Sequence, residues 1–365
     1  MSNTDNQLEK ARKIINEVDA EMAELFVRRM EAARLVAEYK QERGLAIYDA
    51  IREEEVIKRN SEKIKDDELR EYYVNFLRNN MAVSRNYQNR LMHGMKVAYS
   101  GTEGAFAHIA TENLYPSAEK VAFSDFVGAY RAVECGECDI AVLPVENSYN
   151  GEVGQVTDLM FSGTLYVNGI YELAVSHDLL TVPGAEISDV KTVVSHPQAL
   201  GQCAGYIRKH GFSSAEYANT ALAAKYVAEL GDKSVAAIAS ELAAKNFGLN
   251  VADHDINESR SNTTRFAVFS RTANHRVKND TGVHSILLFT VRNEAGALAK
   301  AIDVIGQYGF NMRTLRSRPM KELLWQYYFY VEVEGNVQTE NGKHMMEELG
   351  GFCDRLKFAG TYIKL

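Results

Sequence analysis

Hydrophobic residues recur with a helical period over residues 8–41. They form two rows on one stripe, the first with Leu8, Ile15, Met22 and Val36 and the second with Ala11, Val18, Leu25, Ala32 and Tyr39. No proline or glycine interrupts the run, so the pattern predicts one continuous helix about 50 Å long. Other helices or a second chain must cover so long a stripe. Helical patterns at 49–65 and 67–92 complete a predicted all-helical domain over residues 1–92, which we expect to form an intertwined dimer.

After Met95 the pattern changes to short apolar runs that alternate with helical stretches. The runs predict strands at 96–100, 139–144, 190–195, 235–239 and 264–270. Alternation of this kind indicates an α/β domain, here over residues 95–271. A polar stretch at 272–282 then predicts a linker.

The last part of the chain, residues 283–365, has a third pattern. Strands are predicted at 285–292, 311–317, 326–334 and 356–364, with helices at 296–308 and 340–349. This βαββαβ order indicates an α+β domain with a ferredoxin-like arrangement. The sequence therefore predicts a multidomain protein with all-α, α/β and α+β parts in that order.

Composition and charge narrow the classes of function. The chain has 365 residues, of which 46% are hydrophobic, and a formal net charge of -8, which argues against nucleic-acid binding. No stretch approaches the ~18 apolar residues of a membrane span, and the N-terminus lacks the apolar core of a signal peptide. The four cysteines (Cys135, Cys138, Cys203 and Cys353) suit neither a disulfide framework nor a zinc site. We therefore expect a cytoplasmic protein without metal or membrane contact.

A cation interrupts the apolar stripe of the first helix. Arg29 stands in the row of Leu8, Ile15 and its companions, and a buried unpaired guanidinium costs on the order of several kcal/mol. We therefore expect an anion beside it. Lys40 follows eleven residues later and projects from nearly the same face. Arg12 lies about 100° away around the axis, so it points toward a partner chain's cavity rather than its own.

Further polar residues share faces in the next two helices. Asp49, Arg52 and Glu53 have i, i+3, i+4 spacing, and Ser84 and Gln88 have i, i+4 spacing. One interpretation is a polar, cationic pocket inside a helical bundle. The alternative is that Arg12, Arg52 and Glu53 form ordinary exposed ion pairs.

The spacing of these eight polar residues resembles the all-helical chorismate mutase family over residues 5–91. The resemblance implies a homodimer in which each site takes Arg12 from the other chain, and a rearrangement of chorismate to prephenate without cofactors. Arg12 and Arg29 would clamp the two carboxylates, and Lys40 and Gln88 would donate to the ether oxygen. Support for the ring hydroxyl and the carboxylates would come from Asp49, Arg52, Glu53 and Ser84.

Polar motifs follow the strand ends of the α/β domain. A glycine-containing turn at 101–108 could bring backbone amides to an anion, but it lacks the third glycine of a dinucleotide site. Glu146 and Asn147 end the next strand, at the edge where ligands gather in open α/β sheets. Ser195 ends a third strand as a candidate helix N-cap, so its motif is open to a purely structural interpretation.

Together with Gln202, Thr264 and Arg265, these motifs resemble prephenate dehydratase over residues 95–271. The resemblance implies two α/β lobes like those of periplasmic binding proteins, with a site in the cleft that converts prephenate to phenylpyruvate. Thr264 would donate to the leaving hydroxyl. Substrate positioning or proton relay would fall to Glu146, Asn147, Ser195 and Gln202. Arg265 would serve the carboxylates or only the fold, and we expect structural roles for His108 and His196.

Two turns of the last domain resemble the ACT regulatory domain attached to prephenate dehydratases. The resemblance implies that phenylalanine binds between two such domains and inhibits, through Gly296, Ala297, Leu298, Asn311, Ser317, Arg318 and Pro319. Arg316 stands where the usual motif has Glu, which is expected to weaken contact with the ligand's ammonium group. The alternative is a dimerisation module that binds nothing.

Two other functions stay open at this point. One is a two-lobed binding protein without chemistry, and the other is an enzyme with only one working activity. With both activities present, we expect chorismate and prephenate as substrates, phenylalanine as an inhibitor, and a homodimer or homotetramer.

Overall fold

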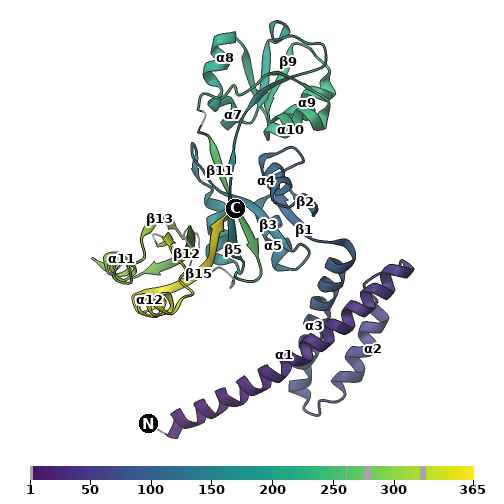
Figure 1. Ribbon diagram of the computed structural model, residues 1–365, viewed down its shortest axis with the longest axis vertical. Helices are drawn as coiled ribbons and strands as arrows, with labels where there is room; N and C mark the ends of the chain where they lie inside the picture. Colours follow the sequence, from purple (N-terminus) through teal and green to yellow (C-terminus); the bar gives the residue numbers. More distant parts are fainter. Residues whose placement is uncertain (1–2, 260, 275–281, 321–325) are drawn as a thin grey trace. The chain divides into compact units, whose positions relative to one another are not determined.

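The computed structural model describes residues 3–259, 261–274, 282–320 and 326–365 and divides the chain into two compact units, Met1–Met95 and Lys96–Leu365 (Figure 1). Most of the predicted linker at 272–282 falls outside the described residues. Within the described part of the chain, no helix is both long enough and apolar enough to span a bilayer. The same residues contain no group of three or more His, Cys, Asp and Glu side chains suited to a metal ion.

Unit 1 consists of the three helices that the hydrophobic period predicted. They are α1 (Asn3–Arg43), α2 (Ala50–Ser61) and α3 (Asp67–His93). Asp49 caps α2 and Asp66 caps α3, each by accepting a backbone N–H at 3.0 Å. Gly94 ends α3 with a φ of 81°, a conformation that favours glycine.

The core of unit 1 is small and lies at one end of α1. Ile57, Leu77 and Met81 are buried between α2 and α3, and Ala33 and Ala37 are the buried apolar residues of α1. Figure 1 shows α1 running well past the ends of its two companions. Much of the predicted stripe is exposed, at Leu8, Ile15, Val18, Met22, Leu25, Val36 and Tyr39. The unit by itself therefore leaves a long apolar helix face uncovered.

The first lobe of unit 2 is a five-stranded layer flanked by helices. Its strands lie in the order β5 (Tyr166–Ala174), β11 (Thr263–Ser270), β3 (Ile140–Asn147), β1 (Lys96–Ser100) and β2 (Glu119–Phe123). Its helices are α4 (Phe106–Leu114), α5 (Phe126–Glu134) and α6 (Gly154–Ser162), and the short β4 (Gly151–Glu152) pairs with β3. The first three strands along the chain pair in parallel, and β11 runs antiparallel between β3 and β5.

The second lobe has its own sheet, in the order β10 (Asn250–Asp253), β6 (Asp178–Thr181), β9 (Val235–Ala239), β7 (Thr192–Ser195) and β8 (Ser213–Glu216). Its helices are α7 (Pro197–Gln202), α8 (Ala204–His210), α9 (Thr220–Leu230) and α10 (Glu241–Phe247), with a 3₁₀ turn at Ile187–Asp189. The chain crosses between the lobes twice, from β5 to β6 and from β10 back to β11. The expected two-lobed α/β architecture is therefore confirmed.

The C-terminal part of unit 2 has the predicted element order. It runs through β12 (Val283–Val291), α11 (Ala297–Gln307), β13 (Met312–Pro319), β14 (Tyr327–Glu334), α12 (Glu340–Gly350) and β15 (Cys353–Lys364). The strands pair antiparallel in the order β13-β14-β12-β15. The end of β15 then pairs in parallel with β5, Ile363 opposite Gly169 and Lys364 opposite Ile170. One continuous sheet thus joins this part to the first lobe.

One local prediction is wrong. Ser195 does not cap α7, because it is still the last residue of β7 and its buried hydroxyl donates to the carbonyl of Ile238 at 2.5 Å. The cap is His196, which has extended backbone angles and accepts the N–H of Gln198 on Nδ1 at 3.3 Å. Pro197 occupies the first helical turn as expected.

Candidate active sites

Arg29 is held between α1 and α3 in unit 1. Its side chain is half-buried, and Nη1 donates to the hydroxyl of Ser84 and to the carbonyl of Asn80 at 3.2 Å. Burial lowers the pKa of the guanidinium, and the charge of Glu53 partly offsets that effect. The arginine in the apolar stripe is therefore part of a polar contact inside the unit and does not lie in bulk solvent.

Three other predicted mutase residues, Lys40, Asp49 and Gln88, have contacts or burial within unit 1. Lys40 donates through Nζ to the carbonyl of Ile47 at 2.5 Å, and Asp49 caps α2. Gln88 is only 8% exposed, and its Oε1 is buried with no hydrogen-bond partner among the described residues. A buried amide oxygen without a partner is costly, so a hydrogen-bond donor to this oxygen would stabilise the unit, and a catalytic role for Gln88 stays a prediction.

The remaining two cations of the predicted set lie on the surface of unit 1. Arg12 is exposed on α1, and Arg52 is exposed on α2, where it pairs with Glu55 at 3.3 Å. Glu53 instead forms an ion pair with Arg85 of α3. Arg85 could not be predicted from local spacing, because its partner Glu53 lies 32 residues away on another helix.

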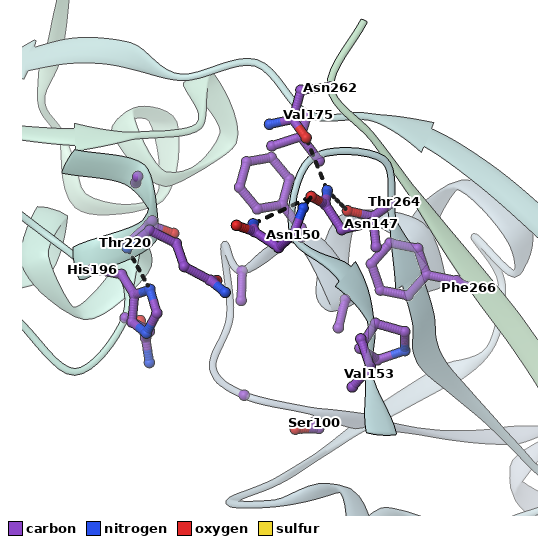
Figure 2. A pocket seen from close by; sticks show the side chains of 18 of the residues that line it. Ser100, Asn147, Asn150, Val153, Val175, His196, Thr220, Asn262, Thr264 and Phe266 are labelled. Atoms are coloured by element: carbon purple, nitrogen blue, oxygen red, sulfur yellow. Dashed lines mark hydrogen bonds between the residues drawn. The ribbon is translucent and has the colours of Figure 1, made fainter. Parts of the chain in front are cut away.

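Unit 2 contains a cavity of about 510 Å³ between its two lobes. The first lobe lines it with Gly101, Phe106, Asn147, Thr264 and Phe266, and the second with His196, Gln198, Gln202, Asn219 and Thr220. Figure 2 shows Asn147 and Thr264 together on one side and His196 and Thr220 on the other. Polar groups from both lobes therefore converge on one space of substrate size.

The register of β11 decides which motif residues face the cavity. Side chains alternate along a strand, so Thr264 lines the cavity and Arg265 points to the opposite face. A bulge in the pairing with β3 sets Thr264 opposite Asn147 and Arg265 opposite Glu146. Glu146 therefore shares the face of Arg265, away from the cavity.

Asn147 is the hydrogen-bonding centre of the cavity. Its Nδ2 donates to Asn262 Oδ1 at 2.8 Å and to Thr264 Oγ1 at 2.9 Å (Figure 2). Its Oδ1 accepts the backbone N–H groups of Tyr149 at 3.0 Å and Asn150 at 2.9 Å. The amide is thus fully bonded and fixed in orientation.

Arg265 ties the first lobe to the C-terminal part of unit 2. It pairs with Glu146 at 3.1 Å and with Glu332 of β14 at 3.0 Å, and it donates to the hydroxyl of Tyr362 at 2.9 Å. Arg316 of β13 forms a second ion pair with Glu146. Of the two roles left open for Arg265, the geometry supports the one in the fold.

The predicted dehydratase residues thus fall into two groups. Asn147, Gln202 and Thr264 line the cavity, whereas Glu146, Ser195 and Arg265 do not and have partners within the protein. Substrate contact by the second group stays a prediction. Several cavity residues were missed, among them Asn219 and Thr220, Asn262, which lies two residues before Thr264, and His177, which follows β5 without any motif.

The buried ion pair of Glu332 predicts a stability effect. Burial alone would raise the pKa of this carboxyl, but the hydrogen bonds and charge of Arg265, together with Tyr362, hold the pKa below its ordinary 4.5. Glu332→Gln should therefore destabilise unit 2 by about 3 kcal/mol at neutral pH, because it removes the most deeply buried of the carboxylates that pair with Arg265.

A depressed pKa contributes stability that is present above the ordinary value and is lost as the pH falls through the lowered one. The difference between the two proteins should therefore shrink below pH 4.5. Urea unfolding followed by circular dichroism measures it, with the exposed Glu334→Gln as the matched control. Equal stability of Glu332→Gln and the parent protein at pH 7 would contradict the assignment.

The predicted regulatory residues lie on two faces of the C-terminal part. Gly296 precedes α11 with a φ of 82°, and Leu298 lines a cavity of about 420 Å³. Asn311 donates to Glu334 at 3.1 Å. Ser317 and Pro319 are exposed, whereas Arg318 turns inward to pair with Asp158 of α6 at 2.9 Å. Arg316 and Arg318 of β13 therefore contact the first lobe, and Leu298 lines a cavity elsewhere in the C-terminal part.

Both units match known families. Residues 11–89 match the family described as chorismate mutase type II, and residues 97–274 match the family described as prephenate dehydratase. The arogenate dehydratase/prephenate dehydratase 2 of Arabidopsis thaliana is 35% identical over 73% of this chain and 72% of its own length. The crystal structure of a prephenate dehydratase in complex with L-Phe, from Arthrobacter aurescens, is 25% identical, with a TM-score of 0.69 over 74% of this chain and 90% of that one.

A further relative spans both units. The bifunctional chorismate mutase/prephenate dehydratase of Aquifex aeolicus is 30% identical to this chain and matches over 98% of each protein. The order of the two matched families along the chain agrees with this full-length alignment. The chain therefore belongs to the family of bifunctional chorismate mutase/prephenate dehydratases.

Proposed function

We propose that unit 1 rearranges chorismate to prephenate and that the cavity of unit 2 converts prephenate to phenylpyruvate, two consecutive steps of phenylalanine biosynthesis. The observation that carries the second step is the bond from Asn147 Nδ2 to Thr264 Oγ1 inside the cavity. Because Thr264 accepts this bond, its own proton is free to be donated to a substrate. An ultraviolet assay with chorismate tests both steps, since alkaline phenylpyruvate absorbance appears only if both work, and accumulated prephenate indicates the mutase alone.

The mutase step needs cations around a dianion and no cofactor. The ether C–O bond of chorismate breaks as a new C–C bond forms, and negative charge grows on the ether oxygen. Arg29 would clamp a carboxylate, with Ser84 beside it, while Lys40 and Gln88 donate to that oxygen. The half-buried position of Arg29 and the buried position of Gln88 support the proposal, since the substrate would be held by side chains that are partly shielded from water.

A second copy of the chain would complete each mutase site. The exposed apolar stripe of α1 needs a cover, and a second α1 offers the same surface in return. Arg12 lies on this exposed part of α1, away from the polar contacts of its own chain. We therefore assign Arg12 to the site of the partner subunit.

Removal of either donor to the ether oxygen should slow only the mutase. For Lys40→Ala or Gln88→Ala we expect a mutase kcat about 10²-fold lower, the size typical of one donor to a developing charge. Dehydratase turnover with added prephenate should stay unchanged. The exposed Lys58→Ala on α2 is the control. Mutase kinetics close to those of the parent in both variants would refute the assignment.

The dehydratase step releases carbon dioxide and water together. The bond to the ring carboxylate breaks, its electron pair enters the ring, and the C–O bond of the ring hydroxyl breaks in turn. The departing oxygen takes up one proton and leaves as water, and the aromatic ring of phenylpyruvate drives the reaction. Thr264 would donate to the departing oxygen, and Asn147 and Gln202 would hold the groups around it.

The C-terminal part would act as a ferredoxin-like ACT domain that binds phenylalanine. Its βαββαβ order and the complex of the related dehydratase with L-Phe support this role. Leu298 lies in the turn expected to hold the ligand and lines a cavity. The ion pair of Glu332 with Arg265 and those of Arg316 and Arg318 with Glu146 and Asp158 connect this domain to the first lobe, which forms one side of the dehydratase cavity.

Phenylalanine should bind to the full chain and inhibit its dehydratase. Calorimetry is expected to show binding heat, which Leu298→Arg should abolish because the larger cation fills the apolar side of the cavity. The matched control is Leu315→Arg, at an exposed position of β13. If millimolar phenylalanine gives no heat with the folded parent protein, the domain is a dimerisation module instead.

A further inference from the structure

A chain of hydrogen bonds runs from the dehydratase cavity through both lobes. Asn147 donates to Asn262 at 2.8 Å, and Asn262 Nδ2 donates to Gln202 Oε1 at 2.9 Å. His177 Nε2 lies 2.9 Å from the same Gln202 oxygen. We call these four residues, Asn147, Asn262, Gln202 and His177, the amide relay. All but Asn147 are less than 8% exposed, so solvent cannot substitute freely for their partners.

Backbone groups fix the direction of the amide relay at one end. The N–H groups of Tyr149 and Asn150 both point to Asn147 Oδ1, and a backbone N–H can only donate. The nitrogen of the Asn147 side chain must therefore face Asn262 and Thr264. Asn262 consequently accepts on Oδ1 and presents its own nitrogen to the next member.

The same logic fixes the protonation of His177 at the other end. Gln202 Oε1 accepts from Asn262, so the ring nitrogen that faces this oxygen must also donate. His177 therefore carries its proton on Nε2. Its Nδ1 is buried without a partner among the described residues, which suits a lone pair far better than a second N–H. Burial also lowers the pKa of the imidazole, against a smaller opposing effect of Gln202.

The direction of the amide relay determines what Thr264 can do. Asn147 has two amide hydrogens, and the two shortest bonds of its nitrogen go to Asn262 Oδ1 and Thr264 Oγ1, with the carbonyl of Thr263 farther away at 3.3 Å. If His177 held its proton on Nδ1, two lone pairs would face each other at Gln202. The amides of Gln202 and Asn262 would then turn over, and the nitrogen of Asn262 would meet that of Asn147. The hydroxyl of Thr264 would lose its fixed neighbour.

We propose that His177 and Asn262 are positioning residues of the dehydratase, which hold Asn147 so that the Thr264 hydroxyl always offers its proton to the substrate. The proposal rests on the dehydratase role proposed above for Thr264. His177 stays a neutral donor throughout and is not the acid of the reaction. Asn262 links Asn147 of the first lobe to Gln202 of the second lobe, so the orientation of the Gln202 amide is coupled to that of the Asn147 amide.

His177 and Asn262 lie on the two segments that connect the lobes. His177 lies in the segment from β5 to β6, and Asn262 lies at the end of the segment from β10 to β11. These are the two crossings between the lobes, and Gln202 joins them from α7 of the second lobe. The amide relay is therefore complete only while the lobes keep the arrangement seen here, so the orientation of Thr264 depends on that arrangement.

Kinetics of the full chain with prephenate test the proposal. Asn262→Ala should lower the dehydratase kcat about 10²-fold, and His177→Phe about tenfold, with KM changed far less, because misplacement of a catalytic group acts on turnover. His177→Phe keeps a ring to pack against Phe106, which lies 5.5 Å away between centroids. His177→Gln should recover most of the loss, since its amide nitrogen can occupy the place of Nε2.

A spectroscopic measurement separates positioning from a merely structural role. Nitrogen-15 spectra of the histidine-labelled protein, assigned by comparison with His177→Phe, should show the Nε2–H tautomer with no titration between about pH 5 and 8, although an ordinary histidine titrates near 6.5. The Nδ1–H tautomer, a titrating His177, or a parent-like kcat in His177→Phe would overturn the proposal. Thermal unfolding of each variant confirms that it is folded.

A parallel measurement on Thr264→Val keeps the two proposals distinct. If this variant loses its activity while the His177 and Asn262 variants keep theirs, only the amide relay is refuted. If Thr264→Val itself remains active, the dehydratase site assigned above fails, whatever the relay variants show.

Discussion

Replacement of Thr264 by valine is expected to lower the dehydratase kcat about 10²- to 10³-fold, the loss typical of one well-placed donor to a leaving or developing anion. Valine keeps the shape of threonine but has no hydroxyl, so the acceptor of the Asn147 bond and the donor to the substrate vanish together. Mutase turnover with chorismate should stay unchanged, because unit 1 shares none of these residues. Steady-state kinetics with each substrate in turn measure both activities.

The neighbouring residue provides the control for this substitution. Thr263→Val removes a hydroxyl from the same strand, but Thr263 is not among the residues that line the cavity, so its activity should match that of the parent. Thr264→Ser restores the hydroxyl and should recover most of the turnover. Full dehydratase activity in Thr264→Val would remove this residue from the mechanism. Loss of both activities together would instead point to misfolding.

Two inactive mutase variants are expected to restore activity when they are combined. Arg12→Ala and Arg29→Ala should each lower mutase kcat/KM about 10³-fold or more, since each removes a charge-assisted clamp on a carboxylate. If every site takes Arg29 from its own chain and Arg12 from the partner subunit, one site of each mixed dimer has both arginines. Random mixing should then recover about one quarter of the parent activity, because half of the dimers are mixed and one of their two sites is intact.

Co-expression of the two variants, followed by a mutase assay of the purified mixture, measures this recovery. Arg34→Ala, at an exposed position of α1 that pairs with Glu38, is the matched control and should stay active by itself. A mixture no more active than its components would show that both arginines act in one chain or that the sites do not span subunits. Dehydratase activity of the same samples confirms the amount of folded protein.

The sequence predicted the elements well, because hydrophobic periodicity is a local property. The strands Lys96–Ser100 and Val235–Ala239 begin and end where the apolar runs do, and the helix around Arg29 extends only a few residues further than expected. Arg29 itself was recognisable, since one cation in an apolar row requires a partner.

The sequence alone could not predict which side chains of the dehydratase motifs face the cavity. Arg265 turns away from the cavity because side chains alternate along β11. A bulge between β3 and β11 shifts the pairing by one residue and places Glu146 on the same face as Arg265. Ser195 failed as a helix cap because α7 begins only at Pro197, which makes His196 the cap. His177 and Asn262 lie far from Gln202 in the sequence and contact it only in the folded chain, so no local signal could predict these contacts.

Because β15 pairs in parallel with β5, the sheet of the first lobe is completed by a strand of the C-terminal part. A protein cut after residue 271 would leave Gly169 and Ile170 of β5 without the neighbouring strand. Such a bare strand edge recruits other chains through its free backbone groups and promotes aggregation. The C-terminal strands therefore cover part of the β5 edge, and we expect a truncated enzyme to aggregate unless a charged or proline-bearing substitution is placed along Tyr166–Ala174.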